Sequence, residues 1–146
     1  MQHTQPFTVR RADWNTDRAA LSAIRREVFV VEQRVPEEEE WDDMDIRCRH
    51  VIALTVDGAA IGTGRLLPDQ RIGRMAVLKA WRERGVGSAL LAELIAMARE
   101  DGHRESRLHA QTHAMVFYRK HGYAAVGGEF IEAGIPHVEM RLVLTP

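Results

Sequence analysis

Apolar residues recur along the chain with two periods, one typical of strands and the other of helices. The segment 7–12 (FTVRRA) alternates as a strand does, and the apolar residues from Leu21 to Val28 follow helical spacing. Asp13 or Asn15 is placed to cap this helix, because a short polar side chain accepts hydrogen bonds from free N–H groups at a helix start. The chain is therefore predicted to open with a strand and then a helix.

The middle of the chain carries the signals of an antiparallel meander. The runs 50–56 (HVIALTV) and 59–67 (AAIGTGRLL) flank the Asp-Gly pair at 57–58, which suits the two-residue turn of a hairpin. A Pro-Asp turn at 68–69 then leads into 71–78 (RIGRMAVL). These three runs are predicted to be consecutive antiparallel strands.

The second half of the chain is predicted to hold two helices and three strands. An apolar face from Val86 to Ala98 marks a helix that ends near Gly102, and another helix is expected over 113–121. Strands are expected at 106–111, 123–126 and 137–144. A strand-helix-strand crossover runs parallel and hairpins run antiparallel, so the pattern predicts an α/β fold with a mixed sheet.

Composition and charge narrow the functional classes. The chain has 146 residues, enough for one domain with its own core, and we expect no boundary within 1–146. The 20 Lys and Arg balance 21 Asp and Glu, which gives no general attraction to nucleic acid or to an anionic membrane. The single cysteine, Cys48, fits a reducing cytoplasm, and no histidine spacing predicts a metal site. No apolar run suits a signal peptide or a membrane span.

A run of acids follows the first helix at 35–45 (VPEEEEWDDMD). Pro36 should interrupt the helix, and the seven acids show no clear period, so we expect a surface loop with at most a short helical turn. The acids would suit a cationic ligand, and the alternative is an ordinary solvated loop.

The stretch RERGVGSA places two glycines at the start of the long helix. Gly85 and Gly87 would leave the N–H groups of the first helical turn accessible to phosphate oxygens. Ser88 would add a hydroxyl, and Arg82 and Arg84 would add positive charge. An anionic ligand would then replace the missing cap, whereas the spacing alone also fits a bare turn. Neither a P-loop motif nor a three-glycine dinucleotide fingerprint is present.

The same stretch resembles the Arg/Gln-x-x-Gly-x-Gly/Ala motif of the GCN5-related N-acetyltransferase (GNAT) family, with Arg82, Gly85 and Gly87 on the matching positions. The preceding strand and the later FYRKHGY match as well, so the ordered resemblance covers about residues 72–123. The segments FVVEQRVP, AQTHAMVFY and EAGIPHVEM resemble the ElaA-like branch of that family. The resemblance implies a single-domain acyl-CoA N-acyltransferase fold, with about six to seven strands and about four helices.

The resemblance further implies that acetyl-CoA is bound as a co-substrate. The glycine loop would hold its pyrophosphate, and the backbone of Met75 to Val77 would hold the pantetheine arm and the thioester. The residues expected to bind the cofactor are Met75, Ala76, Val77, Arg82, Glu83, Arg84, Gly85, Val86, Gly87, Ser88 and Gln111. Gln111, Thr112 and His113 stand where many family members have asparagine, and there the chain departs from the family pattern.

Tyr118 matches the family's general acid, which would protonate the leaving thiolate, whereas the residue type alone also fits a core aromatic. Side chains able to act as the general base are Glu32, His113, His137 and Glu139, and water is an alternative. Glu32 and His137 are the preferred candidates. Glu32 interrupts the apolar run VFVVEQ, which would suit a carboxylate on a mostly buried face with a raised pKa, whereas a surface Glu at a helix end is the commoner case.

The residues together with the family resemblance imply a cytoplasmic, acetyl-CoA-dependent N-acetyltransferase. It would move the acetyl group directly to a primary amine of a small molecule or peptide, with no covalent enzyme intermediate and no metal, and the acid-rich segment would suit a cationic acceptor. Two alternatives stay open, a non-catalytic acyl-CoA-binding module and an acyltransferase that uses a different acyl-CoA. A homodimer is common among similar proteins, and neither nucleic acid nor a membrane is an expected partner.

Overall fold

The computed structural model describes residues 6–144. Residues 1–5, on which part of the signal-peptide assessment rests, and residues 145–146 lie outside the described residues. The helices are α1 (Trp14–Arg25), α2 (Glu37–Glu40), α3 (Val86–Glu100) and α4 (Met115–Lys120). The strands are β1 (Phe7–Ala12), β2 (Arg49–Thr55), β3 (Ala60–Leu66), β4 (Ile72–Val77), β5 (Glu105–Gln111), β6 (Ala124–Glu132) and β7 (Ile135–Val143).

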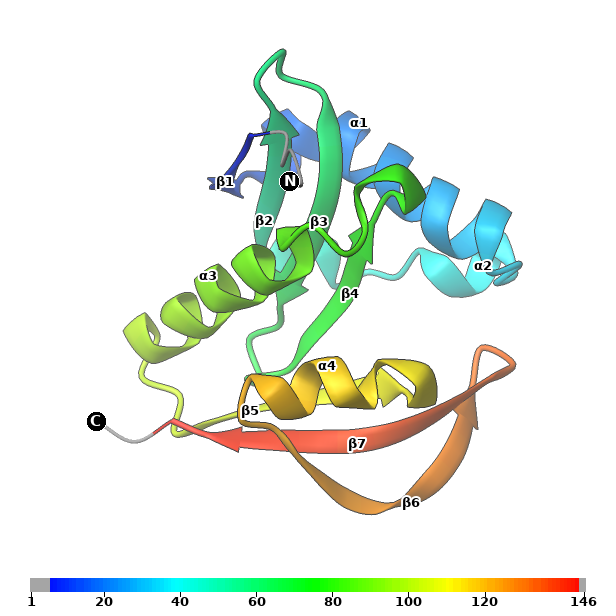
Figure 1. The fold of residues 1–146 in the computed structure, drawn as a ribbon, viewed down its shortest axis with the longest axis vertical. Helices are drawn as coiled ribbons and strands as arrows, with labels where there is room; N and C mark the ends of the chain where they lie inside the picture. The colour runs from blue at the N-terminus through cyan, green and yellow to red at the C-terminus, as the bar shows by residue number, and fades with distance from the viewer. Residues whose placement is uncertain (1–5, 145–146) are drawn as a thin grey trace, which may run out of the picture.

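The strands form two antiparallel sheets, in the orders β1-β2-β3-β4 and β5-β7-β6. The two sheets are joined by an isolated parallel bridge between Arg71 and Arg107, and away from this bridge β4 and β5 diverge (Figure 1). The α/β fold class is thus confirmed. The parallel pairing expected from the strand-helix-strand crossover is limited to that bridge, so the sheet is divided where the sequence pattern suggests continuity.

A β-bulge in β4 accompanies this divergence. Thr63 pairs with Ala76, and Arg65 pairs with Gly73. Between these pairs β4 has two residues, Arg74 and Met75, and β3 has only Gly64. Arg74 has a φ of 51°, in the left-handed region that a non-glycine residue rarely adopts. A bulge bends its strand and increases the local twist, and here the bend turns the second half of β4 away from β5.

The long helix α3 packs on the first sheet as its apolar pattern predicts. Its buried residues are Val86, Leu90, Leu91, Leu94, Ile95, Met97 and Ala98. A Cβ on Gly62 would lie 2.9 Å from Leu90 Cδ1, and one on Gly64 would lie 2.8 Å from Leu94 Cδ1. The two glycines of β3 therefore let α3 approach the sheet more closely than any larger residue would.

The first helix and the first hairpin are also where the pattern places them. Asp13, and not Asn15, is the N-cap of α1, since its side chain accepts from the N–H groups of Asn15 and Thr16. A π-helical segment, Arg26–Glu32, continues α1 and was not predicted. The loop between β2 and β3 runs over 56–59, which is longer than the two-residue turn expected.

The acid-rich segment is only partly a surface loop. Glu40 and Asp45 are buried, with 3% and 4% of their surface exposed, and so is Arg25 with 1%. Arg25 donates hydrogen bonds to Glu40 Oε2 at 2.8 Å and to Asp45 Oδ1 at 2.6 Å. Arg65 donates to Asp45 Oδ1 at 2.8 Å and to Asp42 Oδ2 at 2.7 Å. The expectation of a solvated loop is therefore wrong for Glu40 and Asp45, because arginines from α1 and β3 pair with them, whereas Asp42 is exposed.

Arg74 connects these charges to the bulge of β4. Its Nε lies 3.2 Å from Glu40 Oε2, and its Nη2 donates to the Glu40 carbonyl oxygen at 3.1 Å. We call the six residues Arg25, Glu40, Asp42, Asp45, Arg65 and Arg74 the buried ion network, although Asp42 and Arg74 at its margin are partly exposed. Through it, the bulge is attached to both α1 and α2.

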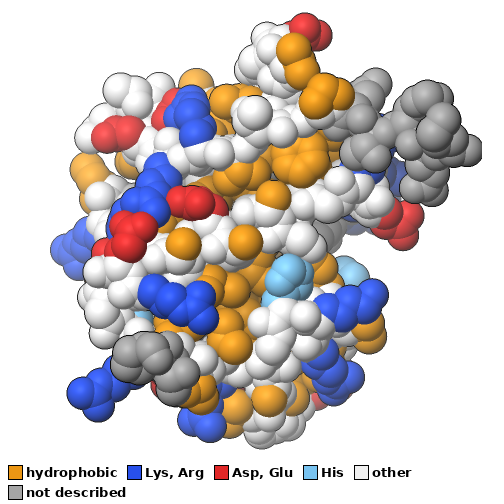
Figure 2. All heavy atoms as spheres, turned by 60° about the vertical axis from the view of Figure 1, so that its left-hand side comes forward, with side chains coloured by type: hydrophobic (Ala, Val, Ile, Leu, Met, Phe, Trp, Pro, Cys, Tyr) orange, Lys and Arg blue, Asp and Glu red, His pale blue; other side chains and the backbone are white. Residues whose placement is uncertain are grey.

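The surface shows charges of both signs. On the face drawn in Figure 2, basic side chains occur in separate groups, with acidic and apolar side chains between them. This mixture agrees with the net charge of −1. No helix within residues 6–144 is long and apolar enough to cross a membrane.

We expect Arg25→Ala to lower the free energy of unfolding by about 3–5 kcal/mol, because Glu40 and Asp45 would stay buried without their partner. Arg26→Ala is the matched control, since Arg26 is exposed and forms its ion pair with the exposed Glu37. Urea unfolding followed by circular dichroism measures both. Equal losses in the two variants would contradict a special role for the buried ion network.

The pKa of Asp42 predicts that part of the free energy of unfolding is lost in acid. The hydrogen bond from Arg65 lowers the pKa of Asp42 to about 2, from an ordinary value of 3.8. Because the folded-state pKa is the lower one, the stabilisation is complete above the unfolded-state pKa and is lost as the pH falls toward 2. The difference in unfolding free energy between wild type and Asp42→Asn should therefore narrow across this window, and a constant difference would refute the assignment.

Candidate functional site

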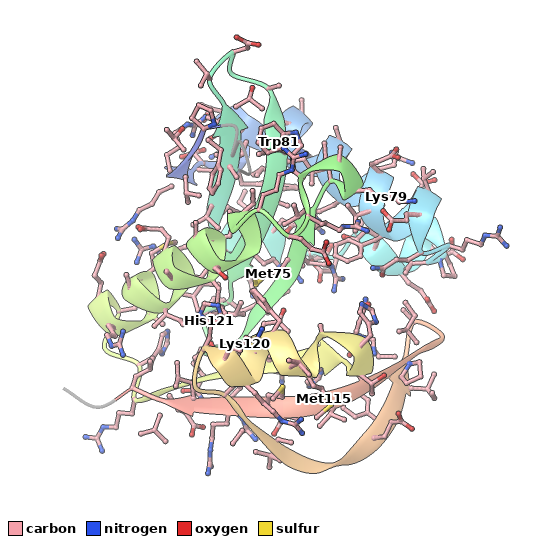
Figure 3. The ribbon with its side chains drawn as sticks, viewed as in Figure 1. Met75, Lys79, Trp81, Met115, Lys120 and His121 are labelled. Atoms are coloured by element: carbon pink, nitrogen blue, oxygen red, sulfur yellow. The ribbon has the colours of Figure 1, made fainter. Side chains whose placement is uncertain are left out.

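A cavity of about 1140 Å³ lies between the two sheets, where β4 parts from β5. A second hollow of about 510 Å³ adjoins it at the start of α3, and the two share Val77, Arg82, Gly87 and Phe117 as lining residues. Figure 3 shows Met75 between β4 and α4, and Lys120 and His121 at the end of α4 beside the start of α3. The site is thus an elongated groove between the sheets that leads to a helix N-terminus.

The start of α3 has the geometry that an anionic ligand requires. Gly85 is its N-cap with a φ of 85°, and no side chain of the described residues caps the helix. The N–H groups of Val86, Gly87 and Ser88 precede the first helical hydrogen bond, so they have no acceptor within the helix. A Cβ on Gly87 would lie 3.4 Å from Phe117 Cζ, in van der Waals contact with that ring. These free donors and the positive end of the helix dipole favour an anion.

The predicted loop residues divide into two groups. Those that line the second hollow are Arg82, Glu83, Gly85, Gly87 and Ser88. Val86 instead is buried in the core, and Arg84 stacks over the ring of Trp81 at 5.4 Å. His121, which sequence reasoning missed, also lines this hollow, and its Nε2 lies 3.0 Å from Ser88 Oγ.

Arg82 is held by protein partners. Its Nη1 and Nη2 donate to the two carboxylate oxygens of Glu32 at 2.5 and 2.7 Å, and its Nε donates to the Val77 carbonyl oxygen at 2.9 Å. The hydrogen bond from Arg82 lowers the pKa of Glu32. The expectation of a raised pKa at Glu32 is therefore wrong, and a carboxylate held in its ionised form by an arginine is a weak proton acceptor.

The predicted strand residues Met75, Ala76 and Val77 line the large cavity. β4 is the edge strand of the first sheet, so one side of its backbone faces the cavity. Gln111 lines the opposite wall, where its Nε2 donates to Gln33 Oε1 at 2.8 Å. This hydrogen bond connects β5 to the end of the π-helical segment across the gap between the sheets.

The helix α4 carries Tyr118 into the cavity. The Tyr118 hydroxyl lies 3.7 Å from Met75 Sδ, and the Tyr118 ring packs edge-to-face on Phe117 and Tyr123. Burial raises the pKa of Tyr118. The hydroxyl therefore keeps its proton at neutral pH and is able to donate a hydrogen bond to a nearby anion such as a thiolate.

His137, on β7, has the arrangement of a proton acceptor. Its side chain is buried, with 8% exposed, and its Nδ1 lies 2.7 Å from the Ile135 carbonyl oxygen. A carbonyl oxygen only accepts, so Nδ1 carries the proton and Nε2 of the neutral ring keeps a lone pair. The nearest carboxylate oxygen to Nε2, Glu132 Oε2, lies 3.8 Å away, too far for a hydrogen bond.

The other candidate bases are placed differently. Glu139 forms an ion pair with Arg107, which occupies its carboxylate. His113 lines the cavity but is exposed.

Sequence reasoning missed Glu132, because the strand β6 was expected to end at 126 and instead continues to Glu132. Within residues 6–144, no three or more His, Cys, Asp or Glu side chains are grouped so as to hold a metal ion.

Comparisons with known proteins agree on one family. The family model described as an acetyltransferase (GNAT) domain matches residues 15–144. The chain is 41% identical over 122 residues to the uncharacterized N-acetyltransferase YjcF of Bacillus subtilis (strain 168), covering 80% of this chain and 86% of that protein. A second relative from the same organism, the uncharacterized protein YyaT, is 35% identical over 92% of this chain and 94% of its own length.

Solved structures are similar over nearly the whole chain. Escherichia coli ElaA has a TM-score of 0.81 and 27% identity, covering 92% of this chain and 99% of ElaA. An acyl-CoA N-acyltransferase from Pseudomonas aeruginosa has a TM-score of 0.82 and 29% identity, covering 94% of this chain and 100% of its own. An aminoglycoside 6′-N-acetyltransferase complexed with coenzyme A has a TM-score of 0.74 and covers 95% of this chain and 98% of its own, and its 18% identity shows the fold alone.

The geometry of the helix start predicts that Gly87→Glu weakens binding of acetyl-CoA and of CoA by at least about tenfold, because it adds a side chain and a negative charge where an anion would lie. Gly128→Glu is the matched control, because a Cβ there meets nothing within 4 Å and Gly128 lies on β6. Isothermal titration with acetyl-CoA, CoA and ATP measures both. Unchanged affinity in Gly87→Glu would refute a phosphate site at this loop.

Proposed function

The chain belongs to the GNAT acetyltransferase family, and from that premise we propose that it moves an acetyl group from acetyl-CoA directly to a primary amine. The resemblance to the ElaA-like branch is confirmed by the similarity to ElaA over 92% of the chain. The observation that carries the proposal is the position of Tyr118. Its protonated hydroxyl lies in a cavity that adjoins an uncapped helix start, so an acid and an anion site share one groove.

The groove supports a role for each part of the donor. The free N–H groups at the start of α3 suit the pyrophosphate, with Lys120 and His121 at the same hollow. The edge of β4 from Met75 to Val77 offers backbone groups to the pantetheine amides and to the thioester oxygen. Arg82 acts on this edge indirectly. Its guanidinium, which the ion pair with Glu32 orients, donates a hydrogen bond to the Val77 carbonyl oxygen and so holds that end of β4 in place.

The acceptor must lose a proton before it reacts, because an ammonium nitrogen has no lone pair. We assign this proton to His137 Nε2, whose lone pair is kept by the hydrogen bond between Nδ1 and the Ile135 carbonyl. Glu32 is not retained as the base, since Arg82 already holds its carboxylate. A proton accepted by His137 can pass to solvent, which prepares the imidazole for the next turnover.

The transfer conserves atoms and charge. The neutral amine attacks the thioester carbonyl, a C–N bond forms and the C–S bond breaks. The leaving sulfur takes the proton of the Tyr118 hydroxyl, and the second amine proton returns through solvent to the tyrosinate. The net reaction of ammonium and acetyl-CoA gives the amide, CoA thiol and one released proton.

Tyr118→Phe is expected to lower kcat by at least about 100-fold, the usual contribution of a positioned acid, while acetyl-CoA affinity stays the same. Tyr123→Phe is the matched control, because the Tyr123 hydroxyl bonds Ser106 in the core and lies outside the cavity lining. Thiol release with a panel of primary amines gives kcat, and titration gives affinity. Wild-type turnover in Tyr118→Phe would contradict the assigned acid, and acetyl-CoA binding without any transfer in the wild type would favour the non-catalytic alternative.

A further inference from the structure

Glu132 is placed to select the acceptor of the reaction proposed above. We propose that Glu132 is a specificity-determining residue that binds the acceptor as an ammonium ion beside His137, so that cationic primary amines are the substrate class. This inference rests on the proposed function and assigns recognition to β6, in place of the acid-rich segment that the sequence suggested. Four observations carry it.

The position of Glu132 is fixed by the hairpin that joins β6 and β7. Glu132 pairs with Ile135 across the hairpin, and Ala133 has a φ of 52° in the turn. Ala133 and Ile135 pack against the apolar cluster that includes Phe29 and Val35. The hairpin tip is therefore held against the first half of the molecule, and Glu132 lies at the wall of the cavity.

One oxygen of Glu132 is bound and the other is available. Oε1 lies 3.0 Å from His109 Nδ1, which donates to it, because a carboxylate oxygen accepts. Oε2 lies 3.8 Å from His137 Nε2. In the neutral imidazole that nitrogen also carries a lone pair, so two acceptors face each other at a distance that no direct hydrogen bond spans.

An ammonium group satisfies both acceptors at once. It has three N–H donors, and a nitrogen placed between Glu132 Oε2 and His137 Nε2 can donate one hydrogen bond to each. A neutral hydroxyl has only one donor and leaves one of the two unsatisfied. His137 is buried, so its free acceptor lacks the exposure to water that would replace such a partner.

The arginines at the cavity wall are already paired, and of the acids there only Glu39 and Glu132 have no arginine partner for their carboxylates among the described residues. Every arginine that lines the cavity lies within 4.0 Å of a carboxylate, and these arginines are Arg65, Arg71, Arg74 and Arg82. Arg107 and Glu139, on the strands beside Glu132, pair with each other. Glu132 instead has only histidine partners among the described residues, so its negative charge stays available to a ligand.

The same carboxylate assists the proton transfer. When His137 Nε2 takes the proton, the positive charge moves from the amine nitrogen to the imidazole ring. Glu132 Oε2 is close to both positions, so the charge stays near its counter-ion throughout the step. Glu132 therefore acts on binding of the acceptor more than on its acetylation.

The direct test uses nuclear magnetic resonance of the histidine ring nitrogens, with butylammonium chloride and butan-1-ol as a matched pair of probes. Butylammonium, and not butan-1-ol, should shift the Nε2 resonance of His137. The shift should be lost in Glu132→Gln and kept in Glu129→Gln, since Glu129 lies on the same strand but outside the cavity lining. Equal shifts from both probes, an equal response in Glu132→Gln, or no response in the wild type would overturn the proposal.

The kinetic test separates this proposal from the proposed function. Glu132→Gln should raise the KM for butylamine by about tenfold or more, the loss of one charged hydrogen bond, with a smaller change in kcat. The KM for aniline, which is neutral at pH 7.5, should stay within about twofold. An unchanged KM for butylamine would overturn the role of Glu132 while transfer itself stands. Failure of Tyr118 to support transfer would instead count against the function, and the resonance shift does not depend on it.

Discussion

The bulge at Arg74 is the constraint on which the rest of the site depends. A regular β4 would continue beside β5, and the cavity between the sheets would be closed by strand pairing. The left-handed backbone at Arg74 is unfavourable for a residue with a Cβ, by about 1–3 kcal/mol. The ion pair between its guanidinium and the buried Glu40 offsets this cost and also fixes where the strand turns.

The buried ion network is thus better understood as a device for position than as a source of stability. Replacing a complete buried ion pair by well-packed apolar residues is often neutral or stabilising, whereas removing one partner is costly. Such a network penalises any arrangement in which one member lacks its partner. Glu40 contacts both Arg25 and Arg74, so the positions of α1, α2 and the bulge are coupled. The network therefore also fixes the position of the cavity wall that the bulge forms.

The features that could be predicted from the sequence are those determined by neighbouring residues. Asp13 caps α1 through N–H groups two and three residues away, and the apolar face of α3 is recognisable within its fifteen residues. The glycines before α3 required only the local argument about a missing cap. In contrast, no residue of β6 is buried, so no alternation of apolar and polar residues marks this strand. Only its pairing with β7 extends it to Glu132. The π-helical segment likewise carries no pattern distinct from the α-helix that precedes it.

Residue type alone also could not decide which group accepts a proton, because the hydrogen-bond partners that the fold supplies decide it. Glu32 and His137 are both suitable in type. Arg82, which lies 50 residues from Glu32, holds that carboxylate in its ionised form. A backbone carbonyl only two residues from His137 accepts a hydrogen bond from Nδ1–H and leaves Nε2 free. The ion pair between Arg82 and Glu32 cannot be seen without the fold. The hydrogen bond at His137 depends on the hairpin of β6 and β7, which packs against the apolar cluster that includes Phe29 and Val35. Chemistry in this groove therefore follows from which polar atoms the fold leaves without a partner.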